Sequence, residues 1–556
     1  MKNIFSALVF AIFGCLALSS CSKDKTIEVS KPKITFDNGT GVYEVKVGRD
    51  ITITPIVEVA ENPSYSWIME GQVVSTHLSY RFTDTDAEGE YYLTFKVTAS
   101  NGTVQEDVRV DVLPLQPPVI SLPVTDEDII TAVVGRQLVI QPSVVNGDYA
   151  TFQWFVDGED AGTSRDLVFR RDAVGDYDIT LTVRNEDGTD TKSAVVRVGP
   201  VPSVSIFFEK DQYSVPRGRK IVLAPYISDA DPEVTYTWKV DNVVQPSSGP
   251  ILSCDVDRDC MVELVAQGAY GSDSKTVMIK CVEPEGTYKR AKTADSNSSS
   301  DRVFEFLPAP GQFVNEGYTA ADMRQACEYA QSRLDAGDYV SLGAFGGYIV
   351  VGFDHSIERR EDGEADFAVL GNAFSTSSEA GIIWVMQDEN GDGEPNDTWY
   401  ELKGSEFGKE GTNRNYAVTY YKPSGPRQAV RWVDNMGNTG TVNWLAIHAQ
   451  DSYYPAWVDS PSYTLRGTCL GQNTSFDPSI GWQINEPFDW GYADNLGADY
   501  KNNALQARIE NAVYADGTPA DLEYIDFVKI QTAINGKAGA LGEISTEVCG
   551  VRDLGL

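Results

Sequence analysis

The chain has 556 residues, and its 45 Lys and Arg against 81 Asp and Glu give a formal net charge of −36. Nucleic-acid phosphates attract surfaces rich in Lys and Arg, so this charge argues against a nucleic-acid partner. The chain has only three histidines, which argues against zinc or histidine-based catalysis and, more broadly, against an enzyme.

The N-terminus has the features of an export signal. Residues 4–18 are apolar, follow the basic Met1-Lys-Asn start and are too few to span a membrane. The run ends in Leu18-Ser-Ser-Cys21, which resembles the lipobox of bacterial lipoproteins. That resemblance implies cleavage of a signal peptide, 1–20, and acylation of Cys21 as a stable membrane anchor. Residues 21–25 would form the tether, and their charge resembles a surface-export tag, so we expect a lipid-anchored, surface-exposed protein of the outer membrane.

A repeat of roughly 85 residues fills the next part of the chain. Each unit has a Gly-Arg pair and then an aromatic-x-Trp triplet, which ends at Trp67, Trp154 and Trp238. In the first two units a Gly-x-Tyr corner follows, at 89–91 and 175–177. Short strands between regularly spaced turns predict β-sandwiches, in which these tryptophans fill the core. Sugar stacking is the less favoured role for them.

This order of Trp and Gly-x-Tyr-x-Leu-x-Val resembles the PKD-like modules of bacterial surface proteins, which have an immunoglobulin-like fold. The resemblance implies three modules, 26–115, 116–200 and 201–285. The third departs from the pattern, because Asp259-Cys260-Met261 replaces the Gly-x-Tyr corner. Short joints that contain proline separate the modules, so we expect them to form a stalk.

Two cysteines of the third module, Cys254 and Cys260, are close in sequence. An exported location permits a disulfide between them. Buried free thiols are an equally good interpretation, because cysteine behaves as a small apolar residue. The sequence leaves the pairing open.

A polar linker, 286–302, leads into a larger region, 303–556, which we predict to be one β-rich sandwich or jelly-roll domain with long loops. It begins with one clear helix, with Thr319 as N-cap, an apolar stripe from Met323 to Leu334, and Gly337 at its end. Further strands are predicted at 340–353, 381–386, 416–421, 429–433, 442–448, 462–466, 507–514 and 524–533.

The loop 388–397 alternates acidic and amide side chains around a turn at Gly393. Such oxygens suit a hard cation such as Ca²⁺. The match to an EF-hand loop is incomplete, because Trp399 stands at the twelfth position in place of a bidentate Glu. A solvated turn without metal is an equally good interpretation. The predicted ligands are Asp388, Asn390, Asp392, Glu394 and Asp397.

Two other loops, 449–459 and 484–495, combine aromatic rings with amide and carboxylate groups. Loops held by a rigid sheet often carry function. This mixture suits a flat ligand with an amide or hydroxyl edge, because the rings stack while the polar groups align the edge. Any single ring is better explained as core, but the group as a whole points to a binding site. The predicted ligand-binding residues are Trp432, Tyr453, Tyr454, Trp457, Asp459, Phe488, Trp490, Tyr492, Asn495 and Tyr500.

Several long motifs of the C-terminal region occur together. They lie at 308–316, at 341–355, in Asp366-Phe-Ala-Val-Leu-Gly-Asn-Ala-Phe374, at 388–402, at 525–532 and at 542–547. Behind PKD-like modules, this combination resembles the BtuH-type surface cobalamin-binding lipoproteins. The resemblance spans 303–556 and implies that this region captures vitamin B12 or a related corrinoid and hands it to an outer-membrane transporter of the TonB-dependent type. A glycan-binding lipoprotein of a polysaccharide-uptake system and an adhesin are the alternatives.

Overall fold

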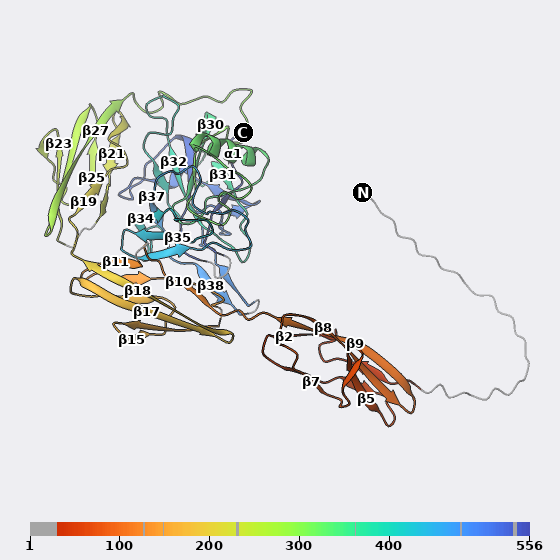
Figure 1. Cartoon of the computed structure of the whole chain (residues 1–556). Helices are drawn as coiled ribbons and strands as arrows, with labels where there is room; N and C mark the ends of the chain where they lie inside the picture. The colour runs from red at the N-terminus through yellow and green to blue at the C-terminus, as the bar shows by residue number, and fades with distance from the viewer. Residues whose placement is uncertain are drawn as a thin grey trace, which may run out of the picture. The chain divides into compact units, whose positions relative to one another are not determined.

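The computed structural model describes residues 30–125, 128–147, 149–228, 233–361, 363–478, 481–537 and 542–556. The chain divides into two compact units, Met1–Gln116 and Pro117–Leu556 (Figure 1). The expected signal peptide, Cys21 and the tether lie outside the described residues. Among the residues that are described, no helix is both long and apolar enough to cross a membrane.

The first unit contains one β-sandwich. Its strands are β1 (Lys33–Thr35), β2 (Val42–Lys46), β3 (Ile51–Ile53), β4 (Ile56–Glu58), β5 (Ser64–Met69), β6 (Gln72–Ser75), β7 (Tyr80–Phe82), β8 (Gly89–Ala99) and β9 (Gly102–Leu113). The main sheet has the order β2-β9-β8-β5-β6, and β2 runs parallel to β9. The pairs β1–β4 and β3–β7 complete the module. Strand side chains alternate between two faces, so every second residue of β8 enters the core.

The second and third modules repeat this architecture. The second has β10 (Val119–Ser121), β11 (Ile129–Val133), β12 (Leu138–Ile140), β13 (Ser143–Val145), β14 (Thr151–Val156), β15 (Glu159–Gly162), β16 (Leu167–Phe169), β17 (Gly175–Asn185) and β18 (Gly188–Gly199). The third has β19 (Ser205–Phe207), β20 (Gln212–Pro216), β21 (Lys220–Leu223), β22 (Tyr226–Ser228), β23 (Thr235–Val240), β24 (Val243–Val244), β25 (Leu252–Asp255), β26 (Cys260–Gly268) and β27 (Gly271–Val282). Their main sheets have the equivalent orders β11-β18-β17-β14-β15 and β20-β27-β26-β23-β24.

One tryptophan contact recurs in all three modules. Trp67, Trp154 and Trp238 are at most 1% exposed. Their indole N–H groups donate to the carbonyls of Leu78 (3.2 Å), Arg165 (3.3 Å) and Gly249 (3.0 Å) respectively. The expected core role of these tryptophans, and with it the sandwich fold, is therefore confirmed.

The third module lacks the corner tyrosine, as its sequence suggests, but the equivalent triplet is 258–260 rather than the expected 259–261. In the first two modules Tyr91 and Tyr177 donate their hydroxyls to the carbonyls of Ala87 (3.1 Å) and Ala173 (3.0 Å). Cys260 takes the equivalent place on β26, four residues before the partner of the core tryptophan. It is a free thiol, as are Cys254 and Cys281, which agrees with the free-thiol interpretation, but all three are only partly buried against the core of the module.

The C-terminal region is a sandwich with one α-helix among its described residues. Its elements are β28 (Arg302–Leu307), α1 (Met323–Asp335), β29 (Val340–Ser341), β30 (Tyr348–Glu358), β31 (Phe367–Leu370), β32 (Gly381–Met386), β33 (Tyr400–Leu402), β34 (Asn413–Tyr421), β35 (Val430–Asp434), β36 (Thr439–Val442), β37 (Ser462–Cys469), β38 (Thr474–Asp477), β39 (Trp482–Asn485), β40 (Tyr500–Lys501), β41 (Ala504–Ala507), η1 (Ile509–Asn511), β42 (Ala512–Val513), β43 (Tyr524–Thr532), β44 (Glu547–Val548) and β45 (Gly550–Asp553). The predicted fold class, mainly β with immunoglobulin-like modules before a β-rich region, is confirmed.

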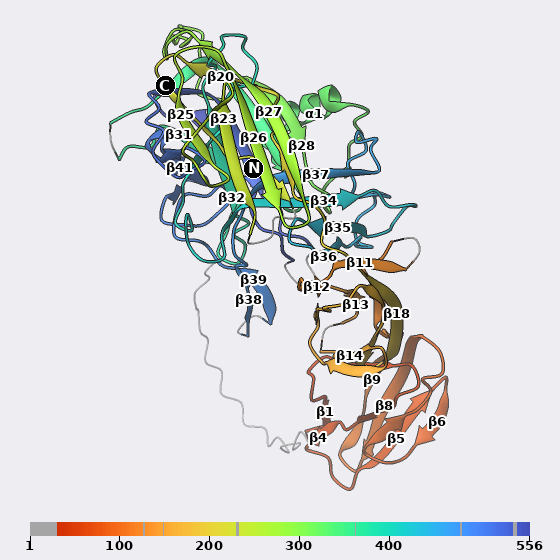
Figure 2. The same cartoon turned by 90° about the vertical axis from the view of Figure 1, so that its left-hand side faces the viewer.

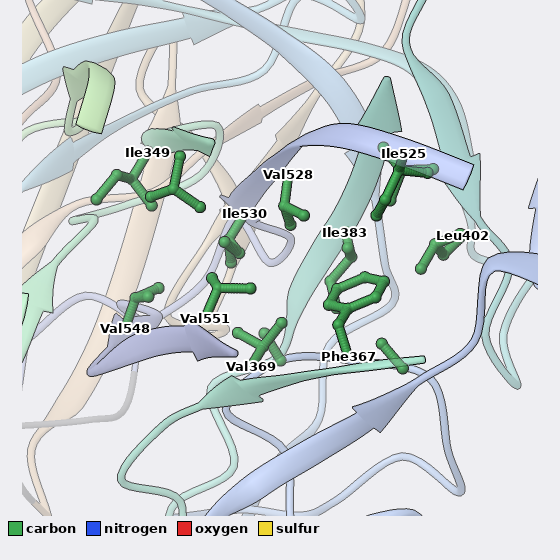
Figure 3. Close-up of a cluster of buried hydrophobic side chains, with 14 of the residues drawn as sticks. Ile349, Phe367, Val369, Ile383, Leu402, Ile525, Val528, Ile530, Val548 and Val551 are labelled. Carbon is green, nitrogen blue, oxygen red and sulfur yellow. The ribbon is translucent and has the colours of Figure 1, made fainter. Parts of the chain in front are cut away.

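Two sheets of this region enclose its main core. One has the order β28-β30-β43-β32-β33-β42 and the other β40-β41-β31-β45. Figure 3 shows Phe367 and Val369 of β31 pointing toward Ile383 of β32 and Val528 of β43. The apolar side of α1 packs against the same core through Ala326 and other small residues.

Four local predictions need correction. The helix begins at Met323, because Asp322 rather than Thr319 is the N-cap and accepts from the backbone N–H of Gln325 (2.8 Å). Residues 443–448 form no strand, and 507–514 is interrupted by η1. The expected strand 340–353 is broken after Ser341, where Gly343 and Gly346 adopt positive φ values of 69° and 84°.

The second and third modules belong to the same compact unit as the C-terminal region. Ile140 of β12 pairs in parallel with Thr439 of β36, so β16 and β12 extend the sheet β36-β35-β34-β37 (Figure 2). The repeat predicts three stalk modules, but two of them are packed into the larger unit. Edge pairing of this kind is a tertiary contact, which a sequence repeat does not reveal.

Candidate functional site

Most of the predicted ligand-binding aromatics are core residues. Trp432, Tyr453 and Tyr454 belong to one hydrophobic cluster, whereas Trp457 and Tyr492 belong to two others. All five are at most 9% exposed. Their rings therefore do not form the shared stacking platform that the sequence predicts. Burial of large rings stabilises the fold, and the two aromatic loops bury theirs in different clusters.

The other predicted residues have varied positions. Asn495 is fully buried and fastens its loop, since its side chain accepts from the N–H of Phe488 (2.8 Å) and donates to its carbonyl (2.9 Å). Asp459 is exposed. Phe488, Tyr500 and Trp490 are partly buried. Of the ten predicted residues, Trp490 alone lines a cavity described here.

This Trp490 cavity has a volume of about 460 Å³ and lies entirely within the C-terminal region. It is located where β32 and the end of β33 approach β41. These strands belong to two different sheets, and the packing of the sheets around the main core brings the segments together. Its lining residues are Gly363, Ala365, Ile383, Leu402, Lys403, Trp490, Gly491, Ala498, Asp499, Lys501, Leu505, Gln506, Ala507, Arg508 and Asn511.

Two glycines hold the Trp490 loop against the residues that follow β33. A Cβ on Gly491 would lie 2.5 Å from the Cα of Gly404, and a Cβ on Gly404 would lie 2.4 Å from the Tyr492 ring. This close approach lets the N–H of Ser405 donate to the Trp490 carbonyl (2.9 Å). Core packing of Tyr492 thus positions the neighbouring indole at the cavity.

The polar groups of the cavity are mixed in charge. Asp499 accepts from the N–H of Gly491 (2.8 Å), and its other carboxylate oxygen is buried without a hydrogen-bond partner. Burial raises the pKa of Asp499. Lys403, Lys501 and Arg508 supply positive charge, while Gln506 and Asn511 supply amides. The sequence does not reveal these six polar residues as a group, because they lie on β40, β41, η1 and the adjoining loops, which only the packing of two sheets brings to the segment after β33.

The 388–397 loop is closed by its own hydrogen bonds. The Asp388 carboxylate accepts from the N–H groups of Gly391 (2.8 Å) and Gly393 (3.0 Å), and Asp392 accepts from the side-chain amide of Asn390 (3.0 Å). The N–H of Glu389 donates to Asp397 (2.8 Å). The last predicted ligand, Glu394, is exposed and lies 3.6 Å from Arg302. These contacts are those of a self-closed turn, and calcium binding by the loop stays a prediction.

Calcium binding can be tested on the full chain by thermal melting. If the loop holds the ion, Ca²⁺ raises the melting temperature and EDTA lowers it, because a ligand of the native state stabilises by mass action. Asp392→Asn should abolish this difference. Asp295→Asn, which changes an exposed aspartate outside the loop, should preserve it. A melting temperature that is the same in calcium and EDTA would mean that the loop binds no calcium and serves only as a turn.

A second acidic group lies elsewhere in the C-terminal region. Carboxylate oxygens of Glu379, Asp494 and Glu547 all lie within 4.8 Å of one another. Burial, with the charge of Asp494, raises the pKa of Glu379 to about 8, and burial raises that of Asp494 to about 7. Burial, with the charge of Glu379, raises the pKa of Glu547 well above its usual value. Three such groups could share protons or hold a divalent cation.

Comparisons with known proteins identify two modules. The model of the PKD-like domain family matches residues 31–99 and 117–185. The expected PKD-like character is thereby confirmed for the first two modules. A search of curated proteins found no significant match.

Solved structures with related architecture were also found. The I67–I69 I-band fragment of titin has a TM-score of 0.22 and 14% identity, and the match covers 45% of this chain and 98% of the fragment. The three N-terminal domains of the bacteriophage RB49 outer capsid protein Hoc have a TM-score of 0.21 and 13% identity, with 46% and 98% covered. Fibronectin(III)-like modules of Clostridium thermocellum CbhA have a TM-score of 0.19 and 18% identity, with 30% and 95% covered. Scores at this level carry no argument about ligands or partners.

Proposed function

We propose that this chain is a lipid-anchored surface protein that captures a corrinoid in its C-terminal region. PKD-like modules at 31–99 and 117–185 support the coarser part of the proposal, because sandwiches of this kind are common in extracellular and cell-surface proteins. Acylation of Cys21, location at the outer membrane and transfer of the corrinoid to a TonB-dependent transporter belong to the same proposal. The protein would bind and release its ligand without catalysing a reaction on it.

The Trp490 cavity carries the ligand proposal. A corrinoid is a broad ring with amide side chains around its edge and a phosphate on its nucleotide arm. The cavity offers one indole face, the amides of Gln506 and Asn511, and nearby cations such as Lys501. These groups could stack on the ring, pair with its amides and approach its phosphate. The 460 Å³ volume would receive an edge of the ring rather than the whole molecule.

Calorimetry of the full chain with cyanocobalamin tests this proposal. Trp490→Ala should weaken binding tenfold or more, since loss of one aromatic anchor costs about 1–3 kcal/mol. Trp482→Ala is the matched control, because Trp482 is 57% exposed on β39 and does not line the cavity. Both variants should keep the circular dichroism spectrum of the parent. Equal loss in both variants, or no binding to the parent chain, would contradict the proposal.

The same cavity also favours one alternative, capture of a glycan. An indole beside Asp499, Gln506 and Asn511 has the chemistry that orients a sugar ring. A parallel titration with oligosaccharides separates the two ligands. Saturable oligosaccharide binding that depends on Trp490, in a chain that does not bind cyanocobalamin, would assign the cavity to glycans.

A further inference from the structure

A second cavity, of about 490 Å³, lies between the third module and the C-terminal region. The module contributes residues of β19, β20 and β22, including Phe207, Tyr213 and Tyr226. The C-terminal region contributes Trp384 and Lys529 from β32 and β43, among others. Its volume lies within the roughly 300–1,000 Å³ range of small-molecule sites. We refer to it as the junction cavity.

Specific polar contacts hold the two sides of the junction cavity together. The guanidinium of Arg219 in the third module donates to the carbonyl of Ala520 (2.6 Å) and to the side chain of Gln387 (3.2 Å). Lys220 Nζ donates to Thr518 Oγ1 (2.7 Å). Lys210 Nζ donates to the carbonyl of Asn396 (2.7 Å). The cavity is therefore part of one compact unit, which extends from Pro117 to Leu556.

Two cations of the junction cavity, Lys529 and Arg466, lie over aromatic rings, and the Glu209 carboxylate acts on both of them electrostatically without forming a direct ion pair. Lys529 Nζ lies 5.0 Å from the Trp384 ring centre and 4.9 Å from that of Trp399. Arg466 Cζ lies 3.9 Å from the ring centre of Phe207. Within the part of the chain that is described, neither Lys529 nor Arg466 forms an ion pair within 4 Å. By contrast Arg414, in the same lining, is 3.2 Å from Glu401.

The lining of the junction cavity has more basic than acidic side chains, unlike the chain as a whole. The lining has four basic side chains, Lys210, Arg414, Arg466 and Lys529, against the three acidic side chains Glu209, Asp397 and Glu401. A positive excess inside a chain of net charge −36 favours an anion at this place. The ammonium group of a lysine such as Lys529 has three N–H donors with which to hold an anion. Burial lowers the pKa of Lys529, so an anion beside it would offset the cost of keeping its charge.

We propose that the junction cavity binds a small organic anion that carries an aromatic ring. Its carboxylate or phosphate would pair with Lys529 and Arg466, and its ring would pack among Trp384, Trp399 and Tyr226. A neutral ligand would leave both cations without a direct ion pair. A small inorganic anion would leave the aromatic walls uncovered. This site is separate from the Trp490 cavity and does not depend on what that cavity binds.

Calorimetry of the full chain with matched probes tests the inference. Indole-3-acetate should bind at least tenfold more tightly than its neutral counterpart, indole-3-acetamide. Lys529→Gln should weaken indole-3-acetate binding tenfold or more and reduce the preference for the acid. Arg466→Gln should weaken it as well, which gives a second variant if one fails to fold. Lys275→Gln, an exposed lysine of β27, is the control and should bind like the parent.

Three results would overturn the inference. The first is equal affinity for the acid and the amide, or no binding of either at millimolar concentration. The second is unchanged affinity for indole-3-acetate in a folded Lys529→Gln protein. The third is tighter binding of glucuronate or inorganic phosphate than of indole-3-acetate, which would show that the ligand needs no aromatic ring. Phenyl phosphate as a further probe distinguishes phosphate-bearing from carboxylate-bearing ligands.

Discussion

Trp238→Ala is expected to destabilise the whole 117–556 unit by about 3–5 kcal/mol, the usual cost of removing a buried tryptophan. The indole is fully buried, and its N–H donates to the carbonyl of Gly249 (3.0 Å), which would lose this partner. The third module shares a compact unit with the C-terminal region, so the C-terminal region should lose stability as well. The equivalent Trp67→Ala should instead destabilise the first unit alone.

Differential scanning calorimetry distinguishes these effects, because the two compact units should melt in separate transitions. Trp238→Ala should lower the transition of the larger unit and leave the other in place, while Trp67→Ala should do the reverse. Trp482→Ala removes an exposed indole and should change stability by no more than about 0.5 kcal/mol. If Trp67→Ala and Trp238→Ala shifted the same transition equally, the division into two units would be wrong.

Glu547→Gln is expected to stabilise the larger unit at alkaline pH. Glu547 is buried beside Glu379 and Asp494, and the pKa values of all three are raised. A raised carboxyl pKa means that the folded state binds the proton more tightly than the unfolded chain. Stability should therefore fall as pH rises from 4.5, the ordinary value for glutamate, to about 8, the value for Glu379. An amide at 547 removes one charge and can donate to its two neighbours.

Urea unfolding in EDTA at pH 5 and pH 8 measures this effect. At pH 8 the variant should have a higher free energy of unfolding than the parent, because it lacks one of the three carboxylates that burial holds close together. The gain should shrink at pH 5, where the cluster is protonated in the parent. Glu361→Gln, at an exposed position, should show no such gain. A parent protein that is equally stable at both pH values, or a variant without a gain at pH 8, would contradict the explanation that the buried carboxylates of this cluster destabilise the unit when they are charged.

Local patterns in the sequence determined the fold class and much of the module architecture. The recurring Trp and Gly-x-Tyr spacing predicts sandwiches, and Trp67, Trp154 and Trp238 each fill a core. These predictions succeed because strand alternation and corner turns depend on residues that are near in sequence. The helix start was missed by one turn, since both Thr319 and Asp322 are acceptable N-caps and only the structure shows which one accepts a hydrogen bond.

Tertiary packing decided the candidate sites. The sequence shows that aromatic residues are abundant in the C-terminal region, but it does not show which rings are buried. Tyr453 and Tyr492 pack into cores, whereas Trp490 lines a cavity with polar residues of β40, β41 and the segment after β33. The junction cavity needs the third module to pack against β32 and β43, a contact between segments more than 100 residues apart. Such contacts depend on the shape and charge of complete surfaces, so local spacing carries no signal of them.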